Sequence, residues 1–470
     1  MTTAMTARER GRRHLVALIT FVYLLLIFEG ALRKWVAPSL GQALFFVRDP
    51  FVLLAYLLAL RHGFFPRNSG FMVAGLVFGL LAVVLVAAQS TMNVATGGSA
   101  MLLAGYGWRN YFFYIPLAFV IGEAFNREDI ERIVRWTLIL AIPTALLVFA
   151  QFMSPLGATI NVGTGDEGLQ YRGLTVDQFH TRPMGFFTSD VGQKEFTVSA
   201  FAMALSLWLS PKARRYMKFW LLLPATGAVL TCLAFGGSRG AMVHAGIIML
   251  AAVACAFLIR GGGISARALI WPTVIGVVAV TLYPIVFPEG FNAFMSRWTT
   301  AAAVESKYFG NLGIIGRALY GFIDFFQLIG DTPIVGYGLG MAGNARLTLG
   351  IEIAGFNGWA ETDWARHIVD LGPVVGLMFI VYRIAFTGWL GIRCLSGARR
   401  LQDPLPLLLF AFTSMDLLYL QITGHGTVNG YGWLFTGFAL AASAGARPET
   451  VTQTAAQPAL LPPRFANLMR

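Results

Sequence analysis

Residues 70–90, GFMVAGLVFGLLAVVLVAAQS, are the stretch that decides the fold class. The stretch has no charged residue, and about 20 apolar residues are enough to cross a hydrocarbon core of ~30 Å. Backbone N–H and C=O groups in lipid must be paired within the segment, so a run of this kind is expected to be helical. It also lacks the strict alternation of apolar and polar residues that a β-barrel strand needs. The stretch therefore predicts a transmembrane α-helix.

Similar apolar runs recur along the whole chain of 470 residues, of which 56% are hydrophobic and only 12% are charged. A soluble domain carries about 25% charged residues, so this composition favours lipid as the solvent. We therefore predict an all-α fold, a polytopic transmembrane bundle of about twelve helices. The expected spans are 14–32, 43–60, 70–90, 100–122, 133–153, 193–209, 217–235, 240–259, 267–287, 366–391, 404–422 and 429–446.

Basic residues cluster in alternate connections between the expected spans, as they do in cytoplasmic loops. With the arginine-rich N-terminus in the cytoplasm, the pattern predicts that both chain ends are cytoplasmic in a bacterial inner membrane. The net charge of +12 is explained by these dispersed residues and does not indicate binding of nucleic acid. The clusters are Arg61/Arg67, Arg127/Arg132/Arg135, Lys212/Arg214/Arg215/Lys218, Arg260/Arg267 and Arg393/Arg399/Arg400.

The domain organisation expected from this pattern is a single transmembrane bundle at 1–446 and a flexible cytoplasmic tail at 447–470. Two long connections fall on the periplasmic side, at 154–192 and 288–365, and the second contains a helix-like stretch at about 311–329. The three cysteines lie in or beside apolar runs without metal-ligand spacing. They therefore predict neither a disulfide framework nor a zinc site.

Arginines on the expected periplasmic side are exceptions to the charge pattern, and they are candidates for binding an anionic ligand. Arg239 lies in the turn GGSRG (236–240), where glycines would let a phosphate group approach the start of a helix. Arg317 lies on the polar face of the helix-like stretch and could point into a shared cavity. For both, a local role in fixing the turn or resting on the membrane surface explains the pattern equally well. Further cations of this kind are Arg109, Arg172 and Arg182.

The segment GWAETDWARHIVDLGP (358–373) holds the densest group of ionisable residues. If a helix begins near Thr362, the ionisable residues of its first turns share one face. This pattern fits a general base beside arginines that hold an anionic leaving group. It equally fits an Asp363–Arg366 pair that anchors a helix end at the headgroup layer. The group comprises Glu361, Asp363, Arg366, His367 and Asp370.

Motifs for nucleotide binding, for a serine nucleophile and for a metal site are absent from the sequence. A periplasmic reaction that uses neither a nucleotide nor a metal needs a substrate that is already activated. A lipid diphosphate is such a donor, and arginines are its natural partners.

The order and spacing of these motifs resemble the O-antigen ligase and Wzy-type polysaccharide polymerase superfamily of integral membrane glycosyltransferases. The resemblance extends from about Glu29 to about Leu395. Each motif is short and loose, and their joint order is the specific feature. The matching segments are GWRNYFFYIPL (107–117), RPMGFFTSDVGQKEF (182–196), LAFGGSRGAMV (233–243), SRWTT (296–300), GRALYGFIDFFQLIGDTPIVGYGLG (316–340) and ETDWARHIVDLGPVVGL (361–377).

This resemblance implies a glycosyl transfer on the periplasmic face, with an undecaprenyl-diphosphate-linked oligosaccharide as donor and acceptor. It implies no metal or nucleotide cofactor, and a chain-length regulator and a flippase as protein partners. A base in the last motif would deprotonate the acceptor hydroxyl. The residues implied in binding the diphosphate or the substrate are Arg239, Arg317 and Arg297, followed by Arg366, Arg109 and Arg182.

The last motif departs from the family pattern. Glu361 stands where the ligases carry histidine, and His367 lies about two helical turns later. The expected base is therefore Glu361, Asp363 or His367. The departure favours a polymerase of exopolysaccharide, capsule or O-antigen repeat units over a ligase that transfers glycan to another acceptor. A transporter of lipid-linked oligosaccharide is the alternative from another class, although transporters typically have discontinuous helices near the membrane centre.

Overall fold

The computed structural model describes most of the chain, and the described residues are overwhelmingly helical. Their only paired strands are β1 (Ala95–Thr96) and β2 (Glu352–Ile353), which are antiparallel. The all-α prediction is therefore confirmed, whereas the predicted tail at 447–470 lies outside the described residues. The described ranges are 6–66, 69–91, 95–96, 100–163, 180–210, 217–259, 270–343, 345–348, 351–353, 360 and 362–444.

In the described part of the chain, five helices are long and apolar enough to cross a membrane, which suggests a membrane protein. A sixth span results if α11 (Ile270–Val286) and the helices at Pro288–Ile323, bent by 104°, are counted together. α9 (Phe219–Phe235) and α17 (Leu405–Leu418) are apolar but shorter. The five are Ala7–Val36, which contains α1 (Ala7–Ala31), then α4 (Gly70–Thr91), α7 (Arg127–Met153), α10 (Arg239–Leu258) and α16 (Asp363–Leu401).

Fewer helices qualify as spans than the sequence predicts, partly because two apolar runs are divided. The run at 43–60 and the run at 100–122 each contain a break within the predicted span. In the second run a π-helical turn separates two helices, and a proline stands in the first turn of the later one, where its missing N–H is tolerated. The pieces are α2 (Gly41–Leu44), α3 (Asp49–His62), α5 (Ala100–Trp108), the π-helical turn η3 (Arg109–Phe113) and α6 (Ile115–Ala124).

α16 is a helical hairpin rather than one straight helix. Its backbone is non-helical at Gly372, with φ 80° and ψ 164°, and Pro373 has no N–H to continue the helix. Arg383 Nη1 lies 2.5 Å from Asp363 Oδ2. In a straight helix the backbones of these two residues would be about 30 Å apart. The first arm therefore folds back along the second.

The bundle has two ends, each named here after one residue. At the Arg12 end, Arg12 of α1 donates a hydrogen bond of 2.6 Å to Asp129 in the first turn of α7. At the Gly372 end, Gln89 in the last turn of α4 donates to the backbone carbonyl of Asp370 over 3.2 Å. The first arm of α16, residues 363–371, runs from the interior of the bundle to this second end, and we call it the short arm.

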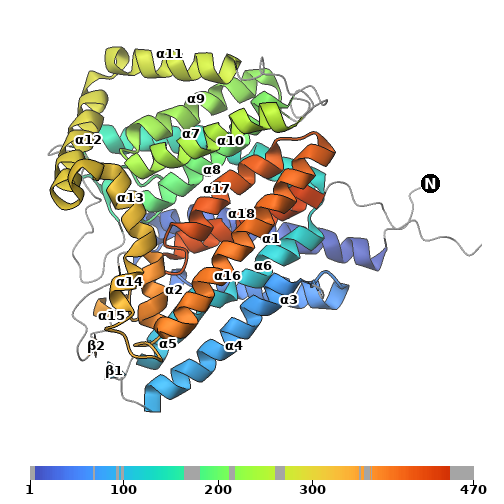
Figure 1. The fold of residues 1–470 in the computed structure, drawn as a ribbon. Helices are drawn as coiled ribbons and strands as arrows, with labels where there is room; N and C mark the ends of the chain where they lie inside the picture. The colour runs from blue at the N-terminus through green and yellow to red at the C-terminus, as the bar shows by residue number, and fades with distance from the viewer. Residues whose placement is uncertain are drawn as a thin grey trace, which may run out of the picture.

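The centre of the bundle is filled by two helices that are buried on nearly all sides. These are α8 (Asp190–Leu209) and α18 (Gly426–Ala444), in which nearly every residue is buried. α18 packs against α6 and α17, and α17 in turn packs against α8, α10 and α16. Figure 1 shows α16, α17 and α18 side by side at the centre, with α8 and α10 next to them.

The long connection predicted at 288–365 contains several helices. In Figure 1, α12 (Pro288–Phe309), α13 (Gly313–Ile323) and α14 (Phe325–Leu328) follow one side of the bundle from α11 to the start of α16. The helix-like stretch predicted at 311–329 contains α13 and α14. Because α14 packs against α16, this connection lies beside the short arm.

Candidate functional site

The short arm begins with a capped helix start. Thr362 Oγ1 accepts a hydrogen bond from the Ala365 N–H at 3.3 Å, so a helix does begin at the position considered from the sequence. The same hydroxyl is 2.7 Å and 2.8 Å from the two carboxylate oxygens of Asp324, to which it donates. The cap therefore ties the start of the short arm to the junction of α13 and α14.

His367 lies in a hydrogen-bond chain that runs in one direction. Arg383 Nη1 is 2.5 Å from His367 Nε2, and a guanidinium can only donate, so Nε2 is the acceptor. His367 Nδ1 then carries the proton and donates to Tyr111 Oη at 3.1 Å. Tyr111 donates to Asp370 Oδ2 at 3.0 Å. His367 is fully buried with both ring nitrogens engaged, so it has no free nitrogen for a substrate proton.

Asp363 is held inside the same network. One of its carboxylate oxygens pairs with Arg383, and the other accepts a hydrogen bond from Thr423 Oγ1 at 2.7 Å. The Asp363–Arg366 pair considered from the sequence does not form, because the hairpin brings Arg383 to Asp363 instead. Asp363 and His367 therefore join the two arms of α16 to the turn between α17 and α18.

Arg366 is a buried cation without a carboxylate partner among the described residues. Only 5% of the residue is exposed to solvent. Nε donates to the Ala360 carbonyl at 3.1 Å, and Nη2 is 3.5 Å from Gln421 Oε1. Gly424 leaves the space that the guanidinium occupies, since a Cβ there would collide with it. A buried charge paired only with neutral dipoles favours an anionic ligand.

His425 lies in the turn between α17 and α18, directly after Gly424, and is close to the start of α8. Its Nε2 is 3.5 Å from Ser189 Oγ, and its Nδ1 is buried without a hydrogen-bond partner. Burial lowers the pKa of His425 to about 4, against the opposing effect of Asp190, so the ring is neutral at pH 7. The cations whose charge also acts on this ring are Arg366, Lys194 and Arg48.

Arg239 and Arg317 meet at a single carboxylate, that of Glu305 on α12. Arg239 binds it in a bidentate manner, with both N–O distances 2.9 Å, at the first residue of α10. Arg317 Nη1 is 3.7 Å from the same carboxylate and its side chain is half exposed. The two arginines are thus brought together as the sequence suggested, but around an anion of the chain itself.

The other predicted cations differ in their surroundings. Arg109 forms a bidentate pair with Asp49, with both N–O distances 2.9 Å. Arg182 pairs with Asp190 at 2.8 Å. Arg297 has a buried Nε without a hydrogen-bond partner. Two of the predicted site residues, the cation Arg172 and the expected base Glu361, lie outside the described residues.

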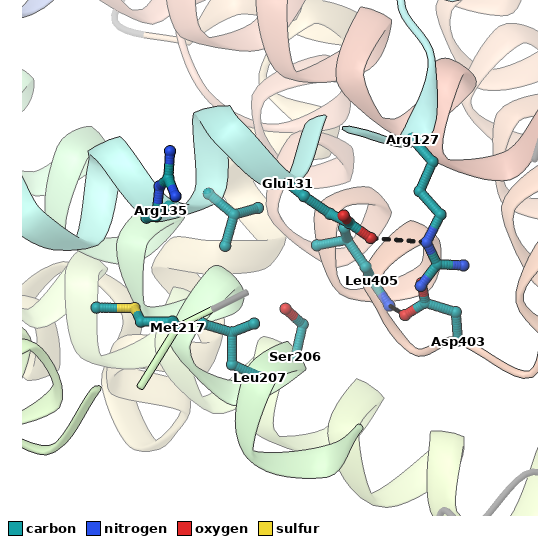
Figure 2. A pocket seen from close by; sticks show the side chains of 9 residues that line it. Arg127, Glu131, Arg135, Ser206, Leu207, Met217, Asp403 and Leu405 are labelled. Atoms are coloured by element: carbon teal, nitrogen blue, oxygen red, sulfur yellow. Dashed lines mark hydrogen bonds and ion pairs between the residues drawn. The ribbon is translucent and has the colours of Figure 1, made fainter. Parts of the chain in front are cut away.

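Two hollows at the Arg12 end contain none of the predicted site residues. One has a volume of about 20 Å³, and Arg127, Glu131 and Asp403 lie beside it (Figure 2). Arg127 bonds to Glu131 at 2.7 Å and to Asp403 at 2.9 Å. The other is a groove of about 580 Å³ between α1 and the start of α7. The groove lining includes Arg12, Arg13, Phe21, Leu24 and Arg132.

Several charged residues of the interior were not singled out by the sequence analysis. His244, Arg383 and Asp416 each lie within a predicted span, where an ionisable side chain is expensive and marks a functional or paired group. Their position within apolar spans therefore indicates a buried polar cluster. Lys194 and Glu195 also lie within a predicted span, among the first residues of 193–209, where charged side chains are less costly than at the centre of a span.

The Gly372 end therefore combines a buried cation, Arg366, with a neutral histidine and an arginine pair that shares one carboxylate. Such a set can bind an anionic group and stabilise negative charge that develops on it. Comparison with protein-family models and with curated proteins returned no match to this chain.

Proposed function

We propose that the chain is a glycosyltransferase that polymerises undecaprenyl-diphosphate-linked oligosaccharide repeat units into an exopolysaccharide, capsule or O-antigen. In this proposal about twelve segments cross a bacterial inner membrane and both termini are cytoplasmic, so the Gly372 end faces the periplasm. The observation that carries the proposal is Arg366, whose buried charge has no carboxylate partner among the described residues. A diphosphate supplies the directly bonded anion that Arg366 lacks among the described residues.

The arginines hold the donor diphosphate in the proposed reaction. Arg366 contacts it directly, and Arg239 and Arg317 exchange the Glu305 carboxylate for phosphate oxygens. One anion replaces another in this exchange, so the two guanidinium groups remain paired throughout. The Arg239–Glu305 pair is then the resting arrangement of the empty site.

The bond-making step uses a base at the entry of the short arm. Glu361 takes the proton of the acceptor hydroxyl, whose oxygen attacks the anomeric carbon of the donor sugar. The bond from that carbon to the diphosphate breaks, and undecaprenyl diphosphate leaves with the electron pair. Asp363 and His367 orient the short arm, because their polar atoms are already occupied by Arg383, Thr423 and Tyr111.

The test is elongation by the purified protein in liposomes that contain the lipid-linked repeat units. We expect longer lipid-linked glycans without any transmembrane gradient. In a deletion strain, accumulation of single repeat units supports a polymerase, whereas accumulation of free lipid-linked polymer supports a ligase. Glu361→Gln is expected to bind donor without turnover, and turnover at the wild-type rate would remove Glu361 from the mechanism.

A transporter of lipid-linked oligosaccharide is a second candidate, favoured by the discontinuous helices. The π-helical turn η3, which separates α5 from α6, resembles the interrupted helices that line transporter sites. The same liposomes separate the two functions. Movement of repeat units across the bilayer without elongation would establish transport and dismiss the transferase.

A further inference from the structure

Three ionisable side chains from three helices meet in the interior beneath Arg239. They are Glu195 of α8, His244 of α10 and Asp416 of α17, which are 0%, 1% and 0% exposed. One potential ligand atom from each lies within 4.8 Å of those from the other two. The three helices pack against one another, so the fold itself brings these groups together.

The imidazole of His244, one of whose nitrogens belongs to this cluster, has one free lone pair. Its Nε2 lies 2.9 Å from the Phe412 carbonyl, to which only a protonated nitrogen can bond. Nδ1 is therefore unprotonated in the neutral ring, and it is buried without any partner. The ring is held by stacking on Phe412, with centroids 5.2 Å apart and planes parallel. A backbone acceptor on the second nitrogen is the usual support of a metal-binding histidine.

The two carboxylates carry more negative charge than their surroundings neutralise. None of the four oxygens of Glu195 and Asp416 has a hydrogen-bond partner, although all are buried. Lys194 Nζ is 3.3 Å from one Glu195 oxygen and provides a single positive charge. Two carboxylates in a low-dielectric interior need a second positive charge, which a proton or a cation must supply.

We propose that Glu195, His244 and Asp416 bind a divalent transition-metal ion of the Zn²⁺ type. An imidazole lone pair selects such ions over Na⁺, Mg²⁺ and Ca²⁺, which prefer oxygen ligands. With metal–ligand bonds of about 2.0–2.2 Å, two ligands of one ion lie at most ~4.4 Å apart, so small side-chain shifts close the site. This site was not predicted from the sequence, because its ligands come from three separated helices without metal-ligand spacing.

The metal ion would join the start of α10 to α8 and α17. His244 lies in the second turn of α10, which begins at Arg239, so the ion would fix the direction of the helix that carries Arg239. This inference goes beyond the proposed glycosyl transfer, in which no step uses a metal.

The first measurement is the metal content of the whole chain, purified in detergent, stripped with a chelator and dialysed against Zn²⁺. We expect one Zn²⁺ per chain in the wild type. His244→Gln and Asp416→Asn should weaken binding beyond the ~10- to 100-fold loss that follows removal of an outer-shell partner. His14→Gln, at an exposed position of α1, is the matched control and should retain the full metal content.

The second measurement distinguishes a metal from a shared proton, using the thermal unfolding of Glu195→Gln. If a metal binds, Zn²⁺ raises the unfolding midpoint of the wild type but not that of the variant. With chelator, the variant should be the more stable protein, because it has lost a carboxylate that faces another carboxylate. The proposal is overturned if the wild type binds no more Zn²⁺ than His244→Gln, or if Zn²⁺ leaves its midpoint unchanged. Both readouts are independent of glycan elongation.

Discussion

At the scale of single residues, Arg366 combines deep burial with contacts to neutral groups only. Removal of a charge-assisted contact to a diphosphate costs about 1.5–3 kcal/mol, which corresponds to a loss of roughly ten- to hundredfold in elongation rate. We expect this loss for Arg366→Ala, measured in liposomes at equal protein content. Arg366→Lys should recover part of the rate, because it restores the charge but not the forked geometry.

The control for this substitution is Arg393→Ala, since Arg393 is exposed on α16 toward the Arg12 end. It should elongate glycans at the wild-type rate. Equal activity of Arg366→Ala and the wild type would show that Arg366 does not contact the diphosphate.

Asp363 and Arg383 form a buried ion pair, and removal of one partner leaves the other charge uncompensated. We expect Asp363→Asn to reduce the free energy of unfolding by about 3–5 kcal/mol. Thermal unfolding in detergent would measure this loss. A double variant, Asp363→Asn with Arg383→Gln, should be more stable than Asp363→Asn alone, because it no longer buries an unpaired guanidinium.

His425 gives the protein a predictable dependence on pH. Burial lowers the pKa of His425 to about 4, whereas an unfolded chain has a histidine pKa near 6.5. Between these pH values the unfolded state binds more protons than the folded state. The contribution of His425 to the free energy of unfolding is therefore largest above about pH 6.5, and it falls as the pH drops toward 4. We expect His425→Gln to lose less stability than the wild type between about pH 7 and pH 5, in thermal unfolding at both values. An equal loss in both proteins would assign the pH dependence to other groups.

A local pattern in the sequence located the start of the short arm, but the partners of the charged residues could not be predicted. A helix start near Thr362 could be considered from the sequence because a cap depends on residues only three positions apart. The Arg239–Glu305 and Asp363–Arg383 pairs join residues 66 and 20 positions apart. Such pairs depend on how helices pack, and no local pattern contains that information.

At the scale of elements, the hairpin of α16 depends on its tip. Gly372 has a left-handed φ of 80°, and a Cβ there would collide with the Ile334 carbonyl. We expect Gly372→Ala to destabilise the protein by more than the ~1–3 kcal/mol of a single strained residue, because the neighbouring chain must also move. Limited proteolysis and thermal unfolding would both detect the change.

Gly388 offers the matched control in the second arm of α16. A Cβ at this position would meet nothing within 4 Å. Gly388→Ala should leave the unfolding midpoint unchanged or raise it slightly, since alanine is the better helix former by about 1 kcal/mol. If both alanine variants behave alike, the tip does not require glycine.

The hairpin also explains why the predicted span at 366–391 was only partly correct. Apolar composition continues through both arms, so it does not reveal a change of direction. The Gly372–Pro373 dipeptide was the available signal, because this pair of residues commonly ends a helix. In the same way, the run at 100–122 is apolar throughout although η3 interrupts it.

At the scale of the whole molecule, the proposed orientation can be tested with introduced cysteines. The three native cysteines are buried, so they should react little with a maleimide. Thr91 and Arg13 are exposed, at the Gly372 end and the Arg12 end respectively. We expect Thr91→Cys to react in intact spheroplasts with an impermeant maleimide, and Arg13→Cys only after the membrane is permeabilised. The opposite pattern would place the proposed site in the cytoplasm.

The central position of α18 has a consequence for biosynthesis. α18 is translated after α6 and α17, the helices whose faces it covers, and Asn429 supplies a hydrogen bond to the Asn110 carbonyl. Until α18 leaves the ribosome, those faces are open to lipid and that carbonyl lacks this donor. The earlier helices therefore pack tightly only after α18 has been inserted between them. Nascent chains stalled before Gly426 should be degraded by membrane proteases.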